Sequence, residues 1–114
     1  MRSHVVVGLC TVSLGLLLHG ADPGAAQKSR KPTAHTVTID GTRFSPETLT
    51  VKVGDTIVWV NKDLIPHTAT SKAAGFDSLV IDTGKSWKYT VKKKGTFPYI
   101  CTFHPTMKGT VRVK

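Results

Sequence analysis

The clearest fold signal in the 114-residue chain lies at residues 49–61, which read LTVKVGDTIVWVN. In the first part of this stretch, apolar residues at 49, 51 and 53 alternate with polar residues at 50 and 52, the pattern of a strand with one buried face. A Gly-Asp turn pair follows, and residues 56–61 are then apolar on both faces, as a central strand would be. The stretch therefore predicts two strands joined by a tight turn.

The same two-residue period continues on both sides of this stretch. It predicts further strands at 36–40, 87–91, 97–101 and 111–113. Turn pairs such as Asp40-Gly41 and Lys94-Gly95 separate these strands. No segment has the apolar spacing of a core helix, and Lys72 to Ser78 has room for at most one helical turn. The pattern predicts an all-β domain of six to eight short strands, either a β-sandwich or a small barrel.

Composition limits the function classes that this chain can serve. The length suits one small domain and excludes a two-domain enzyme. A hydrophobic content of 39% is that of a folded chain. Lys and Arg number 16 against 7 Asp and Glu, which gives a formal net charge of +9. Because no aromatic platform or recognition motif accompanies these charges, we do not expect nucleic-acid binding.

The N-terminus predicts export from the cytoplasm. Residues 1–26 have the form of a secretory signal peptide, with an apolar run at 5–18 and small residues at 24–26. An uncleaved anchor is the alternative, although the run is short for a membrane-spanning helix. Removal of the signal peptide would take Cys10 away and leave Cys101 without a disulfide partner. We expect a flexible basic lead at 27–34, the domain at 35–114, a periplasmic location, and no membrane contact after cleavage.

A possible metal site lies near the C-terminus. Residues 101–107 read Cys-Thr-Phe-His-Pro-Thr-Met, and His67 follows the strongest strand. Alone, Cys101 would more often be a packed strand residue. Together, one thiolate, two imidazoles and one thioether form the ligand set of a blue-copper site. Soft sulfur favours Cu(I) and imidazole accepts both oxidation states, so this set suits one-electron exchange.

These residues resemble those of the cupredoxins, and among cupredoxins most closely those of the amicyanins and the related plastocyanins. The resemblance covers the whole domain and rests on FSPE with LTVKVGDT at 44–56, VWVN with Pro-His at 58–67, and the short Cys-x2-His-x2-Met loop. It implies a cupredoxin-like Greek-key β-sandwich of about seven to eight strands. It also implies one type 1 copper ion, Cu(II) or Cu(I), held by His67, Cys101, His104 and Met107.

The chain departs from the amicyanin pattern at two positions. Thr68 stands where Asn commonly ties the two ligand loops together, and its hydroxyl can make a similar hydrogen bond with a shorter reach. Phe103 stands where proline is usual. Unlike proline, Phe103 has a backbone N–H, which could donate to the Cys101 sulfur and raise the reduction potential.

The resemblance implies a soluble, monomeric electron carrier between redox proteins rather than an enzyme. Its partners would dock on an apolar patch around His104 that contains Phe103, Pro105, Thr106 and Pro66. The Lys92–Lys94 cluster is either a solvated face or a surface that steers an acidic partner.

Three other functions use the same residues. A copper-handling protein is the main alternative, but such proteins favour Met-rich sites and this chain has only Met1 and Met107. A Cys–His hydrolase would need a cleft that a small sandwich does not offer. A zinc site is compatible with the Cys and His ligands but gives Met107 no role.

Overall fold

The computed structural model describes Gly15 and residues 30–114. Apart from Gly15, the predicted signal peptide lies outside the described residues, as does Cys10. Residues 30–114 contain nine strands and no helix, and so no helix there that could cross a membrane. The strands are β1 (Ala34–Asp40), β2 (Arg43–Ser45), β3 (Thr48–Val51), β4 (Thr56–Asn61), β5 (Thr70–Ser71), β6 (Phe76–Asp77), β7 (Ser86–Thr90), β8 (Gly95–Cys101) and β9 (His104–Val113).

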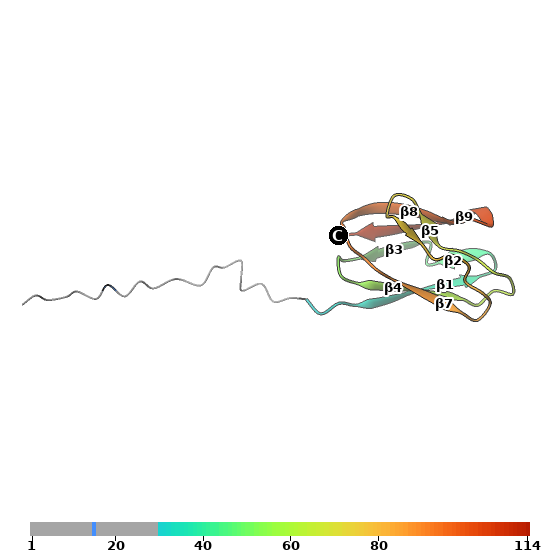
Figure 1. Cartoon of the computed structure of the whole chain (residues 1–114), viewed down its shortest axis with the longest axis horizontal. Coiled ribbons are helices and arrows are strands. Elements are labelled where there is room, and N and C mark those ends of the chain that lie inside the picture. Colours follow the sequence, from blue (N-terminus) through green and yellow to red (C-terminus); the bar gives the residue numbers. More distant parts are fainter. Residues whose placement is uncertain (1–14, 16–29) are drawn as a thin grey trace, which may run out of the picture.

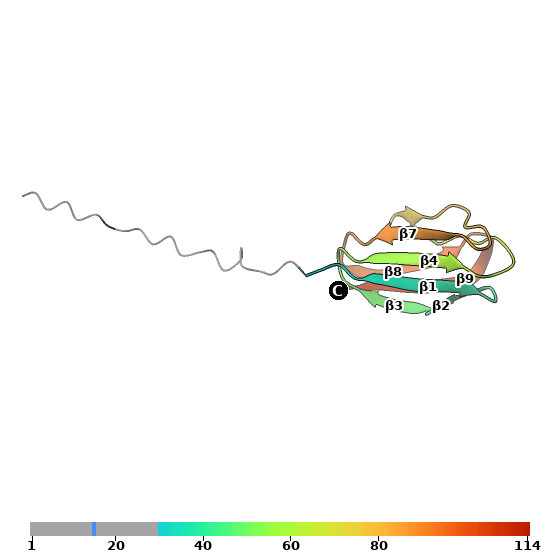
Figure 2. The ribbon, with the colours of Figure 1, turned by 90° about the horizontal axis from the view of Figure 1, so that it is seen from below.

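The strands form two sheets that pack face to face (Figures 1 and 2). One sheet has the order β2-β1-β4-β7 and the other has the order β3-β9-β8-β5-β6. Both sheets are mixed, because β1 pairs parallel with β4 and β3 pairs parallel with β9. The chain thus passes back and forth between the sheets, which confirms the predicted all-β cupredoxin-like sandwich.

Strand β6 lies in the segment for which the sequence allowed a helical turn, Lys72 to Ser78, and β5 ends directly before that segment. This segment forms a turn at 72–75, and the two-residue strands β5 and β6 flank the turn. Strands this short are held by one or two pairings, such as Thr70 with Ile100. They carry no alternation that a sequence pattern could reveal, so the expected number of strands was slightly low.

Aromatic rings fill the space between the sheets. Trp59 of β4 is fully buried, and its ring centroid lies 5.5 Å from those of both Trp87 and Tyr99. Phe76 lies 5.4 Å from Trp59 on another side. Burial raises the pKa of Tyr99 to about 12. These rings make a dry core beside the strand end that carries Cys101.

The strand registers define two ends of the sandwich. The site end holds the last residues of β4 and β8 and the first residue of β9. The tail end holds residues 30–33, 52–55, 91–95 and the C-terminus, which are joined by backbone hydrogen bonds. Figure 1 shows the start of β1 and the C-terminus at this same end. The strand β8 spans the two ends, over about 20 Å.

A buried carboxylate fastens the N-terminal segment at the tail end. Asp55 is 2% exposed and accepts hydrogen bonds from the backbone N–H groups of Thr33 and Lys52. Its other partners are His35 Nε2 at 2.9 Å and Arg30 Nη2 at 2.7 Å. The Thr33 N–H is the main cause that holds the pKa of Asp55 well below its usual range, and His35, Lys52 and Arg30 add to it. This contribution to stability is therefore present above about pH 4 and is lost as the pH falls further.

Gly109 gives a test of how tightly β8 and β9 pack. It pairs with Tyr99, and a Cβ atom at position 109 would clash with the Tyr99 ring. We expect Gly109→Ala to lower the free energy of unfolding by about 1–3 kcal/mol, because the buried ring must shift. Urea unfolding followed by tryptophan fluorescence measures this. Lys108→Ala, at the exposed neighbouring position, is the control and should have little effect; equal stability of the two variants would contradict the packing argument.

Candidate metal centre

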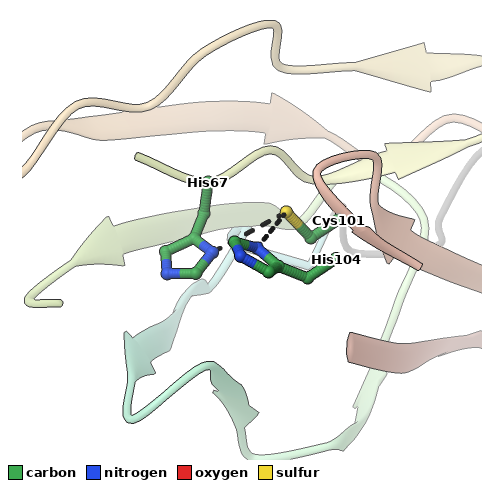
Figure 3. Close-up of side chains that lie close together, drawn as sticks. All are labelled: His67, Cys101 and His104. Carbon is green, nitrogen blue, oxygen red and sulfur yellow. Dashed lines mark hydrogen bonds between the residues drawn. The ribbon is translucent and has the colours of Figure 1, made fainter. Parts of the chain in front are cut away.

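The site end of the sandwich brings three predicted ligands together (Figure 3). Cys101 is the last residue of β8, His104 is the first residue of β9, and His67 lies in the loop after β4. The Cys101 Sγ lies 3.7 Å from the Nδ1 atoms of both His67 and His104. His67 and Cys101 are fully buried, whereas His104 is half-buried. The two imidazoles therefore flank one thiol, and one of them reaches the surface.

This arrangement fits a single transition-metal ion. The donor atoms of His67, Cys101 and His104 all lie within 4.8 Å of one another. Atoms that bind one ion at about 2.0 to 2.3 Å are themselves about 3.5 to 4 Å apart in an open planar or tetrahedral arrangement. One sulfur and two nitrogen donors match the preference of copper, and they also match zinc.

Met107 lies three residues after His104 on β9 and is 4% exposed. Its side chain is part of the buried core cluster that also contains Cys101. The structure thus buries Met107 in the core, three residues after His104 in the chain. Its role as the fourth ligand stays a prediction.

Asp63 holds His67 from the side opposite the thiol. Its Oδ2 lies 2.8 Å from His67 Nε2, so the Nδ1 atom is the one left to face Cys101. The backbone N–H of Thr42 also donates to this carboxylate, and it is the largest cause that lowers the pKa of Asp63, ahead of His67 and Leu64. An ionised Asp63 thus accepts a hydrogen bond from the Nε2–H group of His67 and fixes both the tautomer and the ring orientation.

Thr68 joins the two loops that carry the ligands. Its backbone N–H donates to Cys101 Sγ at 3.3 Å, and its Oγ1 accepts from the Thr102 backbone N–H at 2.9 Å. The hydroxyls of Thr68 and Thr102 are 3.1 Å apart. Thr68 therefore makes the tie expected in place of Asn. Among the hydrogen bonds of residues 30–114, Thr68 and not Phe103 is the backbone donor to the sulfur.

The side chain of Asn61 holds the loop that carries His67 and the loop that leads into β7. It is fully buried at the end of β4, and its Nδ2 donates to the carbonyl oxygens of Ile65 and Ile81. Its Oδ1 accepts from the backbone N–H of Asp63. Ile81 in turn pairs through its backbone with His67. Neither Asn61 nor Asp63 was predicted from the sequence as part of the site. The available signals were a polar residue at the end of an apolar strand and an acidic residue four positions before His67.

The fold and this donor set agree with comparisons to known proteins. The family model of the cupredoxin-like domain matches residues 10–113, so the chain belongs to this family. The amicyanin of Paracoccus denitrificans is 29% identical, over 100% of both chains. The plastocyanin of Scenedesmus fuscus is 30% identical, over 62% of this chain and 86% of the relative.

Solved structures give the same result. The reduced state of an amicyanin mutant is 33% identical, with a TM-score of 0.66 over 71% of this chain and 82% of that chain. A purple cupredoxin from Nitrosopumilus maritimus is 29% identical, with a TM-score of 0.66 over 70% of this chain and 99% of that chain. The cofactor of this family is one type 1 copper ion, and the site end supplies residues that fit it.

The bond between Asp63 and His67 predicts a loss of metal affinity on substitution. In Asp63→Asn the side chain can present an N–H₂ group or a weaker acceptor to Nε2, so the imidazole is held less firmly. We expect the dissociation constant for Cu(II) to rise about 10- to 100-fold. Competition with a chelator of known affinity measures it. Asp82→Asn, which changes an exposed acid at the same end of the sandwich, is the matched control; the same loss in both variants would contradict the role of Asp63.

Proposed function

We propose that this chain is a soluble periplasmic electron carrier that uses one type 1 copper ion bound by His67, Cys101, His104 and Met107. The observation that carries the proposal is the buried Cys101 thiol, which lies 3.7 Å from each of two imidazole nitrogens. When bound, copper supplies a one-electron couple between Cu(II) and Cu(I). Membership of the cupredoxin-like family supports electron transfer rather than catalysis. In electron transfer no bond of a substrate is made or broken.

The protein's own contribution is to keep the donors in place when the charge at the site changes. His67 is held by Asp63, and Cys101 is held by the backbone N–H of Thr68. Both side chains are fully buried, so neighbouring atoms restrict their movement. Because His104 is the partly exposed member of the set, it is the shortest route from the site to a partner.

The loops at the site end also carry exposed apolar side chains. Phe103 is 53% exposed, in agreement with the patch predicted from the sequence, and four apolar side chains that were not predicted are exposed as well. We define the apolar patch as Leu64, Ile65, Leu79, Val80 and Phe103, which are 89%, 40%, 70%, 52% and 53% exposed. The loops that carry the first four are tied together by Asn61. An exposed patch of this kind supports docking of a redox protein at the site end.

Leu79, in the apolar patch, has an unfavourable backbone conformation. Its φ angle is 56°, in the left-handed region that a leucine seldom adopts. Asp77 accepts a hydrogen bond from the Leu79 N–H, and Ser78 donates one to its carbonyl oxygen. The fold thus holds an apolar side chain outward in a strained conformation, which fits a contact residue better than a core residue.

The basic charges do not surround His104 in the way that a simple steering mechanism requires. Lys92, Lys93 and Lys94 lie at the tail end, one β8 length away from Cys101. An acidic partner attracted to them would meet the wrong end of the molecule. We therefore propose that apolar contacts select the partner, and that the carrier acts as a monomer.

Copper titration tests the proposed function directly. Addition of Cu(II) to the purified protein should give an intense blue colour that saturates at one ion per chain and is bleached reversibly by ascorbate. Cys101→Ala should abolish both the colour and the redox response, because the thiolate is lost. Met107→Leu should retain copper but change the spectrum and the potential. A colourless protein would favour copper delivery or a zinc site instead.

Electron self-exchange tests the apolar patch without a known partner. Two molecules that meet through their site ends exchange electrons, and a buried carboxylate at the contact disfavours the encounter. We expect Leu79→Asp to slow self-exchange by about tenfold or more, as measured from NMR line widths in mixtures of Cu(I) and Cu(II) protein. Val53→Asp makes the same kind of change at the tail end, where Val53 is 43% exposed. A similar slowing in both variants would place the contact elsewhere.

A further inference from the structure

The tail end of the sandwich is a concentrated basic surface. Four separate segments meet there: the approach to β1, the turn between β3 and β4, the turn between β7 and β8, and the C-terminus. Their exposed basic side chains, which we name the basic end, are Arg30, Lys31, Lys52, Lys92, Lys93, Lys94 and Lys114. Among the described residues, Asp55 is the acid at this end, and it is buried and already bound to Arg30.

The rest of the described domain has only a small excess of positive charge. The other acids, Asp40, Glu47, Asp63, Asp77 and Asp82, all lie away from the tail end. The remaining basic residues are Arg43, Lys62, Lys72, Lys85, Lys88, Lys108 and Arg112, seven against these five acids. Most of the excess positive charge of the described domain is therefore collected at the end remote from His104.

The basic end lacks the features of a protein-docking surface. Binding hot spots of protein interfaces are enriched in tryptophan, tyrosine and arginine that fill well-packed pockets. Of the large apolar residues that the described structure exposes, only Val53 lies at this end, whereas the apolar patch lies at the site end. Clusters of lysine and arginine without such anchors are instead typical of surfaces that bind anionic lipid headgroups.

The position of the N-terminus points to the same ligand. The chain enters the sandwich at Arg30, whose guanidinium is held by Asp55, and the preceding sequence contains Lys28 and the apolar run at 5–18. The apolar run is thus joined to the domain at the basic end. Arg30, Lys52 and Lys114 also line one open hollow with His35 and Asp55, and the Asp55 carboxylate is already bonded to Arg30 and His35. A headgroup phosphate in this hollow would meet Lys52 and Lys114 as well.

We propose that the basic end is an electrostatic docking surface for an anionic phospholipid bilayer. In this orientation β8 runs away from the membrane, and Cys101, His104 and the apolar patch face the solvent, where they remain free to meet a redox protein. Such peripheral association differs from the sequence-based expectation of no membrane contact, and it does not depend on whether copper occupies the site.

Co-sedimentation with vesicles tests this surface. The protein is used as isolated from the producing cells, with its N-terminus defined by intact mass. It should bind vesicles of phosphatidylglycerol and phosphatidylcholine but not vesicles of phosphatidylcholine alone. Raising the salt from about 20 mM to about 300 mM should release it, because the charges are solvent-exposed. This salt effect needs no variant, and its absence would overturn the proposal.

Two charge-reversal variants separate the basic end from net charge alone. The triple variant Lys92→Glu, Lys93→Glu, Lys94→Glu should lose more than about tenfold in binding. The control Lys62→Glu, Lys85→Glu, Lys108→Glu has the same net charge but changes residues outside the basic end, and it should bind more tightly than the first variant. Equal loss in both would overturn the proposal. Failure of the wild-type protein to bind vesicles, with slower electron transfer to an acidic protein in the first variant, would assign this end to a protein partner instead.

Discussion

The hydrogen bonds of Thr68 are the constraint on which the metal centre depends. One backbone N–H donates to Cys101 Sγ, and the side chain of the same residue accepts from the Thr102 N–H. Because His67 precedes Thr68 directly, these bonds fix the distance between the first imidazole and the thiol. They join segments more than thirty residues apart in the chain. A local sequence motif cannot make such a joint by itself, since it needs both loops at the same end of the sandwich.

The sandwich supplies that placement through the pairing of its strands. β4 belongs to one sheet and β8 to the other, so the site spans the two layers. Packing of Trp59 against Tyr99 holds the layers together just below the site. Hydrogen bonds from the Asn61 side chain then join the end of β4 to both neighbouring loops. The ligands are thus positioned by a dry aromatic core on one side and by buried polar contacts on the other, which leaves only His104 near solvent.

The two ends of the molecule have different chemistry. The site end is apolar and nearly balanced in charge, whereas the tail end is strongly basic and carries the chain termini of the described domain. Apolar surfaces favour contact at close range, and exposed charges act over about a Debye length. Separation of these surfaces by the length of β8 lets each meet a different kind of partner without competition. A small domain can in this way be oriented at one end and react at the other.

The sequence by itself determined the class of the fold and the chemistry of the donor set. Alternation of apolar and polar residues specifies strands locally, and Cys101, His104 and Met107 lie within seven residues of each other in the sequence, so both signals are readable without coordinates. Only the tertiary structure decided that Asp63 and Asn61 serve the site, that Thr68 rather than Phe103 donates to the sulfur, and that the lysines gather away from His104. The physical reason is that strand alternation repeats every two residues, whereas these contacts depend on strand pairing and loop paths that join distant parts of the chain.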